Sequence, residues 1–413
     1  MNFLLLAWVI LATFLESVRT QSYLTTCDRV RRHGYPCDTH SVTTADGYIL
    51  TMFRVPHAHY GDAQMSAEGR PVVFLMHCLL GSSDIWVLNG PETALPFVLA
   101  DAGYDVWMGN ARGNVYSENH ISLSSSSPEF WSFALDEIGV IDLPAKLDYV
   151  MKQTQQKKLH YVGYSQGTTA FMMALSTIPR LNGVMKTSHL LAPVAFMCHM
   201  KSPAVRVASE FFGKPNALAD FLGTLPVQGV WELLRGLGPT FCKNQIFSQF
   251  CVAILNFITG WDSPYLNRTL LPDIIQTLPA GGSNRQIFQY MQSFISCHFR
   301  AYDLGLRGNM ERYGKPYPPD YKLENIHPES PIQIYYSDND FFVSLEDVQR
   351  LHKIIGNKAS WHRIQFDKFN HFDFTLSYNV KSCVNSCVVD KIQEYEGRPF
   401  NGSMCDHFKP NVF

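Results

Sequence analysis

The stretch "HYVGYSQGTTAFMMAL", residues 160–175, places one serine between two glycines where an apolar run gives way to a helix-like run. A strand that passes directly into a helix needs a sharp turn, and small residues on either side let the backbones approach closely. Such a turn holds the hydroxyl of Ser165 beside the first N–H groups of the helix, which favour a developing oxyanion. The motif Gly163-Tyr-Ser-Gln-Gly167 therefore predicts a nucleophilic serine, although an ordinary glycine-rich turn can carry the same bare pattern.

A serine hydroxyl is a weak nucleophile, so it needs a histidine as general base and a carboxylate that orients the imidazole. When the serine lies at a strand-to-helix turn, the acid and then the histidine follow it along the chain. His371, in "KFNHFDFTL", follows a predicted strand near the C-terminus, where we expect the base. His362 lies inside the predicted strand "SWHRIQF" and is poorly placed for a role on a loop.

Two aspartates follow the predicted strand in "PIQIYYSDND", and either could orient the base. Asp340 ends the polar turn, so we favour it over Asp338, while a purely turn-forming role is the alternative for each. A joint role is disfavoured because two carboxylates beside one histidine would repel each other unless one were protonated.

Two backbone N–H groups are expected to stabilise an oxyanion in such a site. One belongs to Gln166, directly after the serine. The other comes from a loop after an earlier strand, "FLMHCLLGSS", where Leu79 is the expected donor and His77 helps to shape the loop. The chain has no paired His or Cys spacing typical of zinc and no glycine-rich phosphate loop, so we expect neither a metal nor a cofactor.

Strand-like and helix-like runs alternate along most of the chain, which predicts an α/β fold with a doubly wound, mostly parallel sheet. Ligands of such sheets gather at the carboxyl ends of the strands, and Ser165, Asp340 and His371 all follow predicted strands. From Lys201 to about Ala280 the sequence instead reads as helical pieces broken by Gly and Pro and rich in Phe, Leu and Trp. We therefore expect a core of residues 21–200 and 301–413 with an inserted, mainly helical cap or lid.

The N-terminal residues 1–20 have the short apolar centre of a signal peptide, with a membrane-anchoring signal as the alternative. No later segment is a clean membrane span. Ten cysteines and the glycosylation sequons at Asn267 and Asn401 agree with the secretory pathway, so we expect a secreted or lysosomal protein. The formal net charge of −2 gives no reason to expect nucleic acid as a partner.

Several ordered stretches together resemble the acid lipase family, the gastric- and lysosomal-type lipases of the α/β-hydrolase superfamily. They are "HGYPCDTHSVTTADGYILTMFRVP", "HCLLGSSDIW", "AGYDVWMGNARGNVYS", "FWSFALDEIGVIDLPA", "YVGYSQGTT", "SDNDFFVSLEDV" and "FNHFDF". The resemblance implies an α/β-hydrolase fold, the catalytic residues Ser165, Asp340 and His371, and the oxyanion donors Leu79 and Gln166. It also implies a cap disulfide between Cys242 and Cys251.

This chain departs from the family pattern in three places. Cys78 follows His77 where the family usually has His-Gly, and Tyr164 precedes the serine where the family usually has His. Five further cysteines look additional to the family pattern, and their pairing cannot be read from the sequence; they are Cys27, Cys37, Cys383, Cys387 and Cys405.

The resemblance implies a serine lipase that hydrolyses neutral lipid esters, above all acylglycerols, at a lipid–water interface. A sterol-ester or small-ester carboxylesterase is the alternative enzyme, and a lipid-binding homologue with little turnover is the alternative from another class. The sequence does not indicate an oligomeric state.

Overall fold

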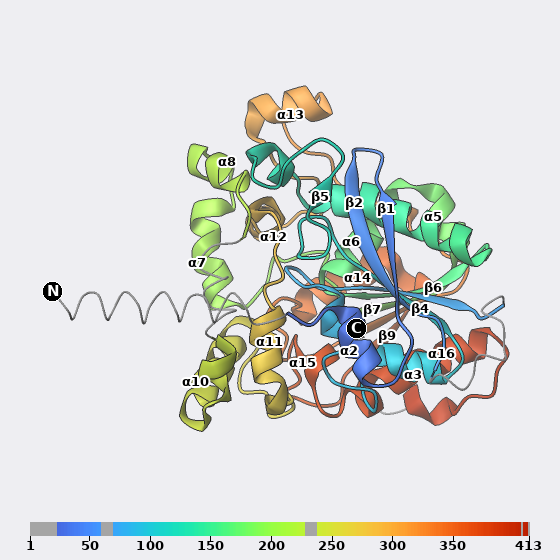
Figure 1. Cartoon of the computed structure of the whole chain (residues 1–413). Helices are drawn as coiled ribbons and strands as arrows, with labels where there is room; N and C mark the ends of the chain where they lie inside the picture. The colour runs from blue at the N-terminus through green and yellow to red at the C-terminus, as the bar shows by residue number, and fades with distance from the viewer. Residues whose placement is uncertain (1–22, 59–68, 228–237, 406–407, 412–413) are drawn as a thin grey trace.

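The computed structural model describes residues 23–58, 69–227, 238–405 and 408–411 of the 413-residue chain (Figure 1). The predicted signal peptide at residues 1–20 lies outside the described residues. The centre of the described part is a nine-stranded sheet in the order β1-β2-β4-β3-β6-β7-β8-β9, with β5 beside β2. The strands are β1 (Asp38–Thr43), β2 (Tyr48–Val55), β3 (Val72–Met76), β4 (Asp105–Gly109), β5 (Asn119–His120), β6 (Leu159–Tyr164), β7 (Met185–Leu191), β8 (Ile332–Tyr336) and β9 (Ala359–Arg363).

The sheet begins with an antiparallel hairpin and continues as a parallel array. β1 and β2 form the hairpin around Gly47, whose φ of 95° suits a residue without a side chain. β2 is also antiparallel to β4. From β4 onward, every pair of adjacent strands in the order β4-β3-β6-β7-β8-β9 is parallel. Strands β3, β4, β6 and β8 are buried along their whole length, which explains their continuous apolar sequences. The prediction of a mostly parallel sheet is confirmed.

Helices cover both faces of this sheet: α5 and α6 lie on one face, and α3 and α16 on the other (Figure 1). Helix α5 begins directly after a π-helical turn, Ile138–Asp142, and Pro144 lies in its first turn, so this proline marks a fresh helix start. The helices outside the β7–β8 connection are α2 (Thr26–Arg32), α3 (Leu95–Asp101), α4 (Leu135–Glu137), α5 (Leu143–Thr154), α6 (Gln166–Thr177), α14 (Leu345–Ile355), α15 (Asp373–Leu376) and α16 (Ser386–Tyr395).

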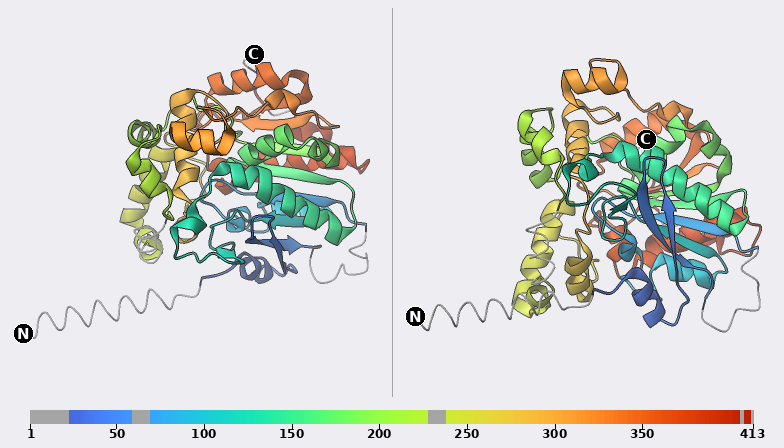
Figure 2. Two further views of the ribbon diagram at one scale, coloured as in Figure 1. Left: turned by 90° about the horizontal axis from the view of Figure 1, so that it is seen from above. Right: turned by 45° about the horizontal axis from the view of Figure 1, so that its top comes forward.

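A long helical excursion separates β7 from β8. Figures 1 and 2 show its helices standing along one side of the sheet-containing body, with α13 projecting from one end. Its described helices are α7 (Pro203–Phe212), α8 (Ala217–Gly223), α10 (Gln245–Thr259), α11 (Leu271–Thr277), α12 (Asn284–Ser296) and α13 (Gly305–Tyr313). We call residues 201–300 of this excursion the cap; α13 lies just beyond it.

Four disulfide bonds join cysteines of the described residues, and Cys78 and Cys383 are free and buried. The bridges are Cys27–Cys37, Cys198–Cys297, Cys242–Cys251 and Cys387–Cys405. Of the five additional cysteines, Cys27 and Cys37 form a bridge near the N-terminus, Cys387 and Cys405 form one near the C-terminus, and Cys383 is free. Within the described ranges, no helix has the length and apolar character needed to cross a membrane.

The two sequon asparagines differ in their surroundings. Asn401 is exposed, whereas Asn267 is half-buried and its side-chain amide donates a hydrogen bond to Asn89 Oδ1 at 3.1 Å. Asn401 is therefore the more open of the two acceptor positions.

Candidate active site

The turn that carries Ser165 joins β6 directly to α6. Ser165 has φ 53° and ψ −111°, a strained conformation for a residue with a side chain. A Cβ atom added to Gly163 would lie 2.8 Å from the Gly167 carbonyl carbon, and one added to Gly167 would lie 2.3 Å from Met76 O. The two glycines are therefore required for the close backbone packing that projects the serine.

The structure brings the three predicted residues together in one hydrogen-bonded line. His371 Nε2 lies 2.8 Å from Ser165 Oγ, and His371 Nδ1 lies 2.7 Å from Asp340 Oδ2. The serine hydroxyl can therefore donate to Nε2 while Nδ1–H donates to the carboxylate, which is the geometry in which a neutral imidazole can remove the serine proton. Asp340 is fully buried, and the exposed fractions of His371 and Ser165 are 4% and 6%.

The two candidate aspartates have separate partners. The other carboxylate oxygen of Asp340 accepts hydrogen bonds from the N–H groups of Phe342 and Val343, at 2.8 and 3.1 Å. Asp338 instead forms ion pairs with Arg363, at 2.8 Å, and with Lys409, at 3.1 Å. Asp340 is thus the aspartate that contacts the imidazole, and Asp338 joins the end of β9 to the C-terminal segment.

A second buried carboxyl group stabilises the loop that carries His371. Asp373 Oδ2 accepts hydrogen bonds from Asn370 N at 2.7 Å and from Ser263 Oγ at 2.6 Å. Ser263 belongs to the cap and lies just after the end of α10. Burial raises the pKa of Asp373 to about 7, the hydrogen bonds from Asn370 and Ser263 oppose this rise, and the charge of Asp340 adds to it. Asp373 was not predicted from the sequence, because "HFD" alone does not reveal a buried carboxyl group.

Asp373→Asn is expected to change how the free energy of unfolding depends on pH. The raised pKa means that folding takes up a proton between about pH 4 and about pH 7. The wild type should therefore lose stability relative to the variant as the pH rises through this window, by about 1.4 kcal/mol per pH unit at most. Urea unfolding of both proteins at pH 5, 6, 7 and 8 measures the difference, and parallel stability curves would contradict it.

The predicted oxyanion loop is fixed through His77. The N–H of Ala111 donates to His77 Nε2 at 3.0 Å, so the proton resides on Nδ1, which donates to Cys78 O at 2.8 Å. Gly81 N donates to the same carbonyl at 3.0 Å. The Cys78 carbonyl and the Leu79 N–H share one peptide plane, so these bonds fix the direction of that N–H group. Burial lowers the pKa of His77 to about 3, which keeps the ring neutral in mildly acidic solution.

The cysteine in this loop does not occupy a backbone conformation that requires glycine. Leu80 has a positive φ of 53°, whereas Cys78 is not among the residues with positive φ. The thiol is buried and packs against Gly81, where an added Cβ would lie 2.8 Å from Cys78 Sγ. Burial raises the pKa of this thiol to about 12, so it stays protonated at neutral pH.

Cys78→Gly is expected to leave kcat within about threefold of wild type, because the Cys78 carbonyl keeps both of its hydrogen bonds. It should also lower the free energy of unfolding by about 1–3 kcal/mol through added backbone freedom and lost packing. Ester turnover and urea unfolding check this result, with Cys78→Ala as a control that removes the thiol without freeing the backbone. A turnover several-fold above wild type would show that Cys78 distorts the loop.

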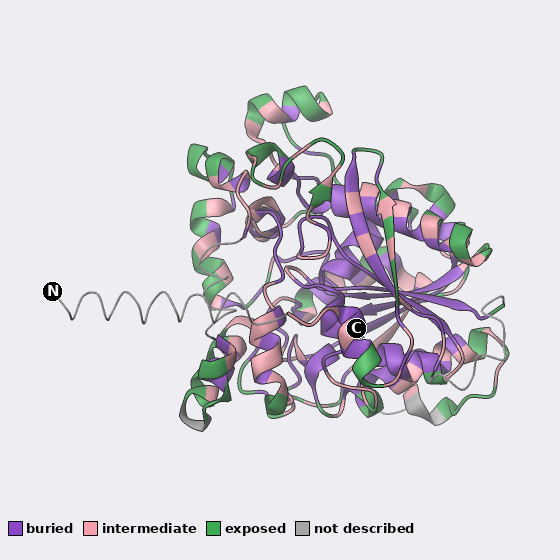
Figure 3. Cartoon of the chain, in the orientation of Figure 1, coloured by how far each residue is buried: buried purple, intermediate pink, exposed green. Residues whose placement is uncertain are grey.

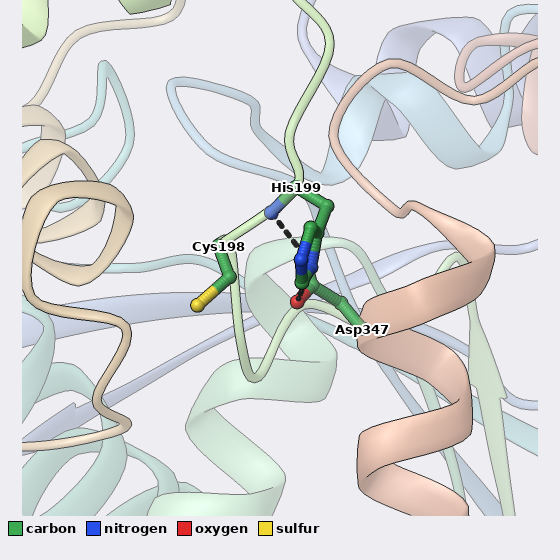
Figure 4. A group of neighbouring side chains, drawn as sticks. All are labelled: Cys198, His199 and Asp347. Carbon is green, nitrogen blue, oxygen red and sulfur yellow. Dashed lines mark hydrogen bonds and ion pairs between the residues drawn. The ribbon is translucent and has the colours of Figure 1, made fainter.

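One cluster of metal-ligand residue types occurs among the described residues, and its members are Cys198, His199 and Asp347 (Figure 4). His199 donates to the Asp347 carboxylate from its backbone N, at 2.9 Å, and from Nδ1, at 3.1 Å. Cys198, the third member, is bonded to Cys297, so its sulfur is not available as a thiolate ligand. The cluster therefore joins the start of the cap to α14 and does not offer a metal-binding set.

The cap contacts the residue directly after the nucleophile. Gln166 Nε2 donates to Gln286 Oε1 on α12 at 2.9 Å, and both side chains are buried. On the same pair of helices, the hydroxyl groups of Thr169 and Tyr290 lie 2.8 Å apart. Side-chain hydrogen bonds thus connect α12 of the cap to the start of α6, which carries one of the two expected oxyanion donors.

The sheet order and the strained serine turn are those of an α/β-hydrolase. Residues 71–205 match the family model described as the alpha/beta hydrolase fold, and residues 26–90 match that of a partial alpha/beta-hydrolase lipase region. A solved structure from Sulfolobus solfataricus, 14% identical, agrees in fold with a TM-score of 0.56 over 87% of this chain and 94% of the other.

Three curated relatives define the family more closely. Lipase 3 of Drosophila melanogaster is 40% identical over 89% of this chain and 93% of its own length. Gastric triacylglycerol lipase of Bos taurus is 38% identical over 87% of this chain and 89% of its own length. Human lipase member J is 36% identical over 87% of this chain and 97% of its own length. The chain belongs to the acid lipase family, as its sequence motifs predict.

Proposed function

We propose that this chain is a serine lipase that hydrolyses the carboxylic ester bonds of acylglycerols through an acyl-enzyme intermediate. The observation that carries the proposal is the hydrogen-bonded line from Ser165 through His371 to Asp340 at the β6–α6 turn. Relatives named gastric triacylglycerol lipase support the choice of acylglycerols over other esters.

In this proposal, Ser165 Oγ attacks the ester carbonyl carbon while His371 Nε2 accepts the serine proton. Asp340 holds the imidazole tautomer and stabilises the cation. The N–H groups of Leu79 and Gln166 stabilise the tetrahedral oxyanion. His371 then donates its proton to the leaving alcohol, and a water molecule repeats the sequence on the acyl-enzyme to release the fatty acid.

The outer side of the cap supports a lipid–water interface as the place of action. Helix α10, of sequence "QIFSQFCVAILNFIT", contains no charged residue, and every third or fourth residue along one side is an exposed apolar side chain. Exposed apolar residues also lie on α7 and α8, on outward surfaces that Figure 3 shows in green. The exposed apolar residues of the three helices are Val207 and Phe211 on α7, Leu218 and Phe221 on α8, and Phe247, Phe250, Ile254 and Phe257 on α10. Helices α8 and α10 both contact α7, and exposed apolar side chains gathered on neighbouring surface helices are typical of a contact with lipid or another apolar partner.

Secretion or lysosomal delivery is the proposed destination. The four disulfide bonds are stable in an oxidising compartment and are rare in the cytosol. The predicted signal peptide at residues 1–20 and the sequons at Asn267 and Asn401 support the same pathway.

A substrate panel separates this proposal from its alternatives. Purified mature protein is assayed with emulsified trioleoylglycerol, an emulsified sterol oleate and dispersed short-chain esters, each across pH. The proposal predicts turnover of the long-chain acylglycerol that rises steeply once an emulsion forms. Turnover confined to dispersed short-chain esters would identify a small-ester esterase, and preference for the sterol ester would identify the other alternative.

A further inference from the structure

Tyr164, the residue directly before the nucleophile, lies against the loop that carries the base. Its side chain is fully buried, and its phenol donates a hydrogen bond to the backbone carbonyl of His371 at 2.8 Å. The centroids of its ring and of the His371 imidazole are 5.4 Å apart. One side chain therefore joins the last residue of β6 to both the backbone and the ring of the general base.

His371 lies on a loop between β9 and α15, so no regular hydrogen-bonding pattern fixes its backbone. Its own N–H donates to Thr259 O at a long 3.4 Å, and Phe342 packs against its ring with centroids 4.9 Å apart. The phenol of Tyr164 supplies the shorter of the two backbone bonds. Burial raises the pKa of Tyr164 well above its usual value, so the phenol keeps the proton that it donates.

The same side chain is one of the places where this chain departs from the family pattern, since acid lipases usually carry histidine before the serine. A phenol reaches farther from the backbone than an imidazole and ends in a hydroxyl donor. A ring of similar shape without the hydroxyl would keep the packing against the imidazole and lose the hydrogen bonds of the phenol, to the His371 carbonyl and with the Thr375 side chain. The hydroxyl group can therefore be tested separately from the ring.

We infer that Tyr164 is a positioning residue, whose hydrogen bond to the His371 carbonyl holds the imidazole at the distance from Ser165 that proton transfer requires. This inference rests on the proposed roles of Ser165 and His371. Proton transfer requires the donor and acceptor to be within hydrogen-bonding distance, and small displacements of a catalytic group lower the rate strongly. Tyr164 acts through His371 and does not contact the reacting atoms.

Tyr164→Phe tests the inference, with Tyr335→Phe as the matched control. Tyr335 is equally buried on strand β8, and its phenol lies 3.2 Å from His189 Nδ1 and 3.7 Å from Cys387 Sγ, neither of which belongs to the proposed site. We expect Tyr164→Phe to lower kcat by about threefold to tenfold, the effect of one net hydrogen bond, and to leave KM within about twofold. The rate at which a fluorophosphonate modifies Ser165 should fall by the same factor as kcat. Tyr335→Phe should leave both rates near wild type.

A loss of thermal stability without a kinetic effect would contradict the inference. If Tyr164→Phe unfolds at a lower temperature but reacts with the fluorophosphonate and hydrolyses the ester at wild-type rates, the phenol is only structural and the inference is wrong. Labelling also separates this inference from the proposed function, since the labelling rate does not depend on the lipid substrate. Wild-type protein that labels at Ser165 without hydrolysing acylglycerols would overturn the proposed substrate, and slower labelling of Tyr164→Phe would still support the positioning role.

Discussion

Replacement of Ser165 with alanine is expected to lower kcat/KM for the long-chain acylglycerol by about 10⁶-fold, as the loss of a serine nucleophile does in other hydrolases. The reason is that His371 then has no hydroxyl to activate, and only the oxyanion donors and substrate binding remain to accelerate attack by water. Initial rates on emulsified trioleoylglycerol, at protein concentrations that allow slow turnover to be detected, measure the change.

The control for this variant is Ser188→Ala, which removes the hydroxyl of another fully buried serine, on the neighbouring strand β7. Its kcat/KM should stay within about tenfold of wild type, since large effects of point changes require one of a few specific mechanisms. A Ser165→Ala protein that retains more than about one hundredth of wild-type turnover would place the nucleophile elsewhere in the chain.

The second large effect is expected for Asp340→Asn, which should lower kcat by about 10³- to 10⁴-fold with little change in the fold. An amide in this place can present N–H to His371 Nδ1, which favours the tautomer with the proton on Nε2, and such a ring cannot accept the proton of Ser165. The amide also removes the charge that stabilises the imidazolium. Steady-state rates together with thermal unfolding separate this catalytic loss from loss of structure.

Asp338→Asn, two residues away, is the matched control for this substitution. Asp338 pairs with Arg363 and Lys409 at a partly exposed position, so its loss should cost about 1 kcal/mol or less of stability and leave kcat within about threefold. Equal kinetic losses for the two variants would contradict the assignment of separate roles to the two aspartates.

The residues of the site that were predictable from the sequence are those whose roles depend on local chain geometry. Ser165 was predictable because a strand, two flanking glycines and a helix can meet only through a strained turn. Asp340 and His371 follow strands, and the parallel order brings the carboxyl ends of those strands to one edge of the sheet. The mostly parallel sheet followed in the same way from the alternation of strand-like and helix-like runs.

The remaining features depend on contacts between distant residues, which no local pattern reveals. Tyr164 and His371 are separated by 207 positions along the chain, and their hydrogen bond exists only because β6 and the loop after β9 lie at the same edge of the sheet. The partners of Asp373 and the pairing of the terminal cysteines likewise depend on the folded chain. The boundaries of the cap were placed by composition alone and stay a prediction, because a change in composition does not mark where one packed unit ends.

Covalent labelling tests most directly whether Ser165 is the nucleophile of a lipase. Folded protein is treated with a fluorophosphonate, the modified peptide is identified by mass spectrometry, and hydrolysis of emulsified trioleoylglycerol is followed in the same samples. We expect a single adduct on Ser165 and a loss of hydrolysis in proportion to its formation. Absence of an adduct on Ser165, or complete modification of Ser165 that leaves hydrolysis intact, would contradict it.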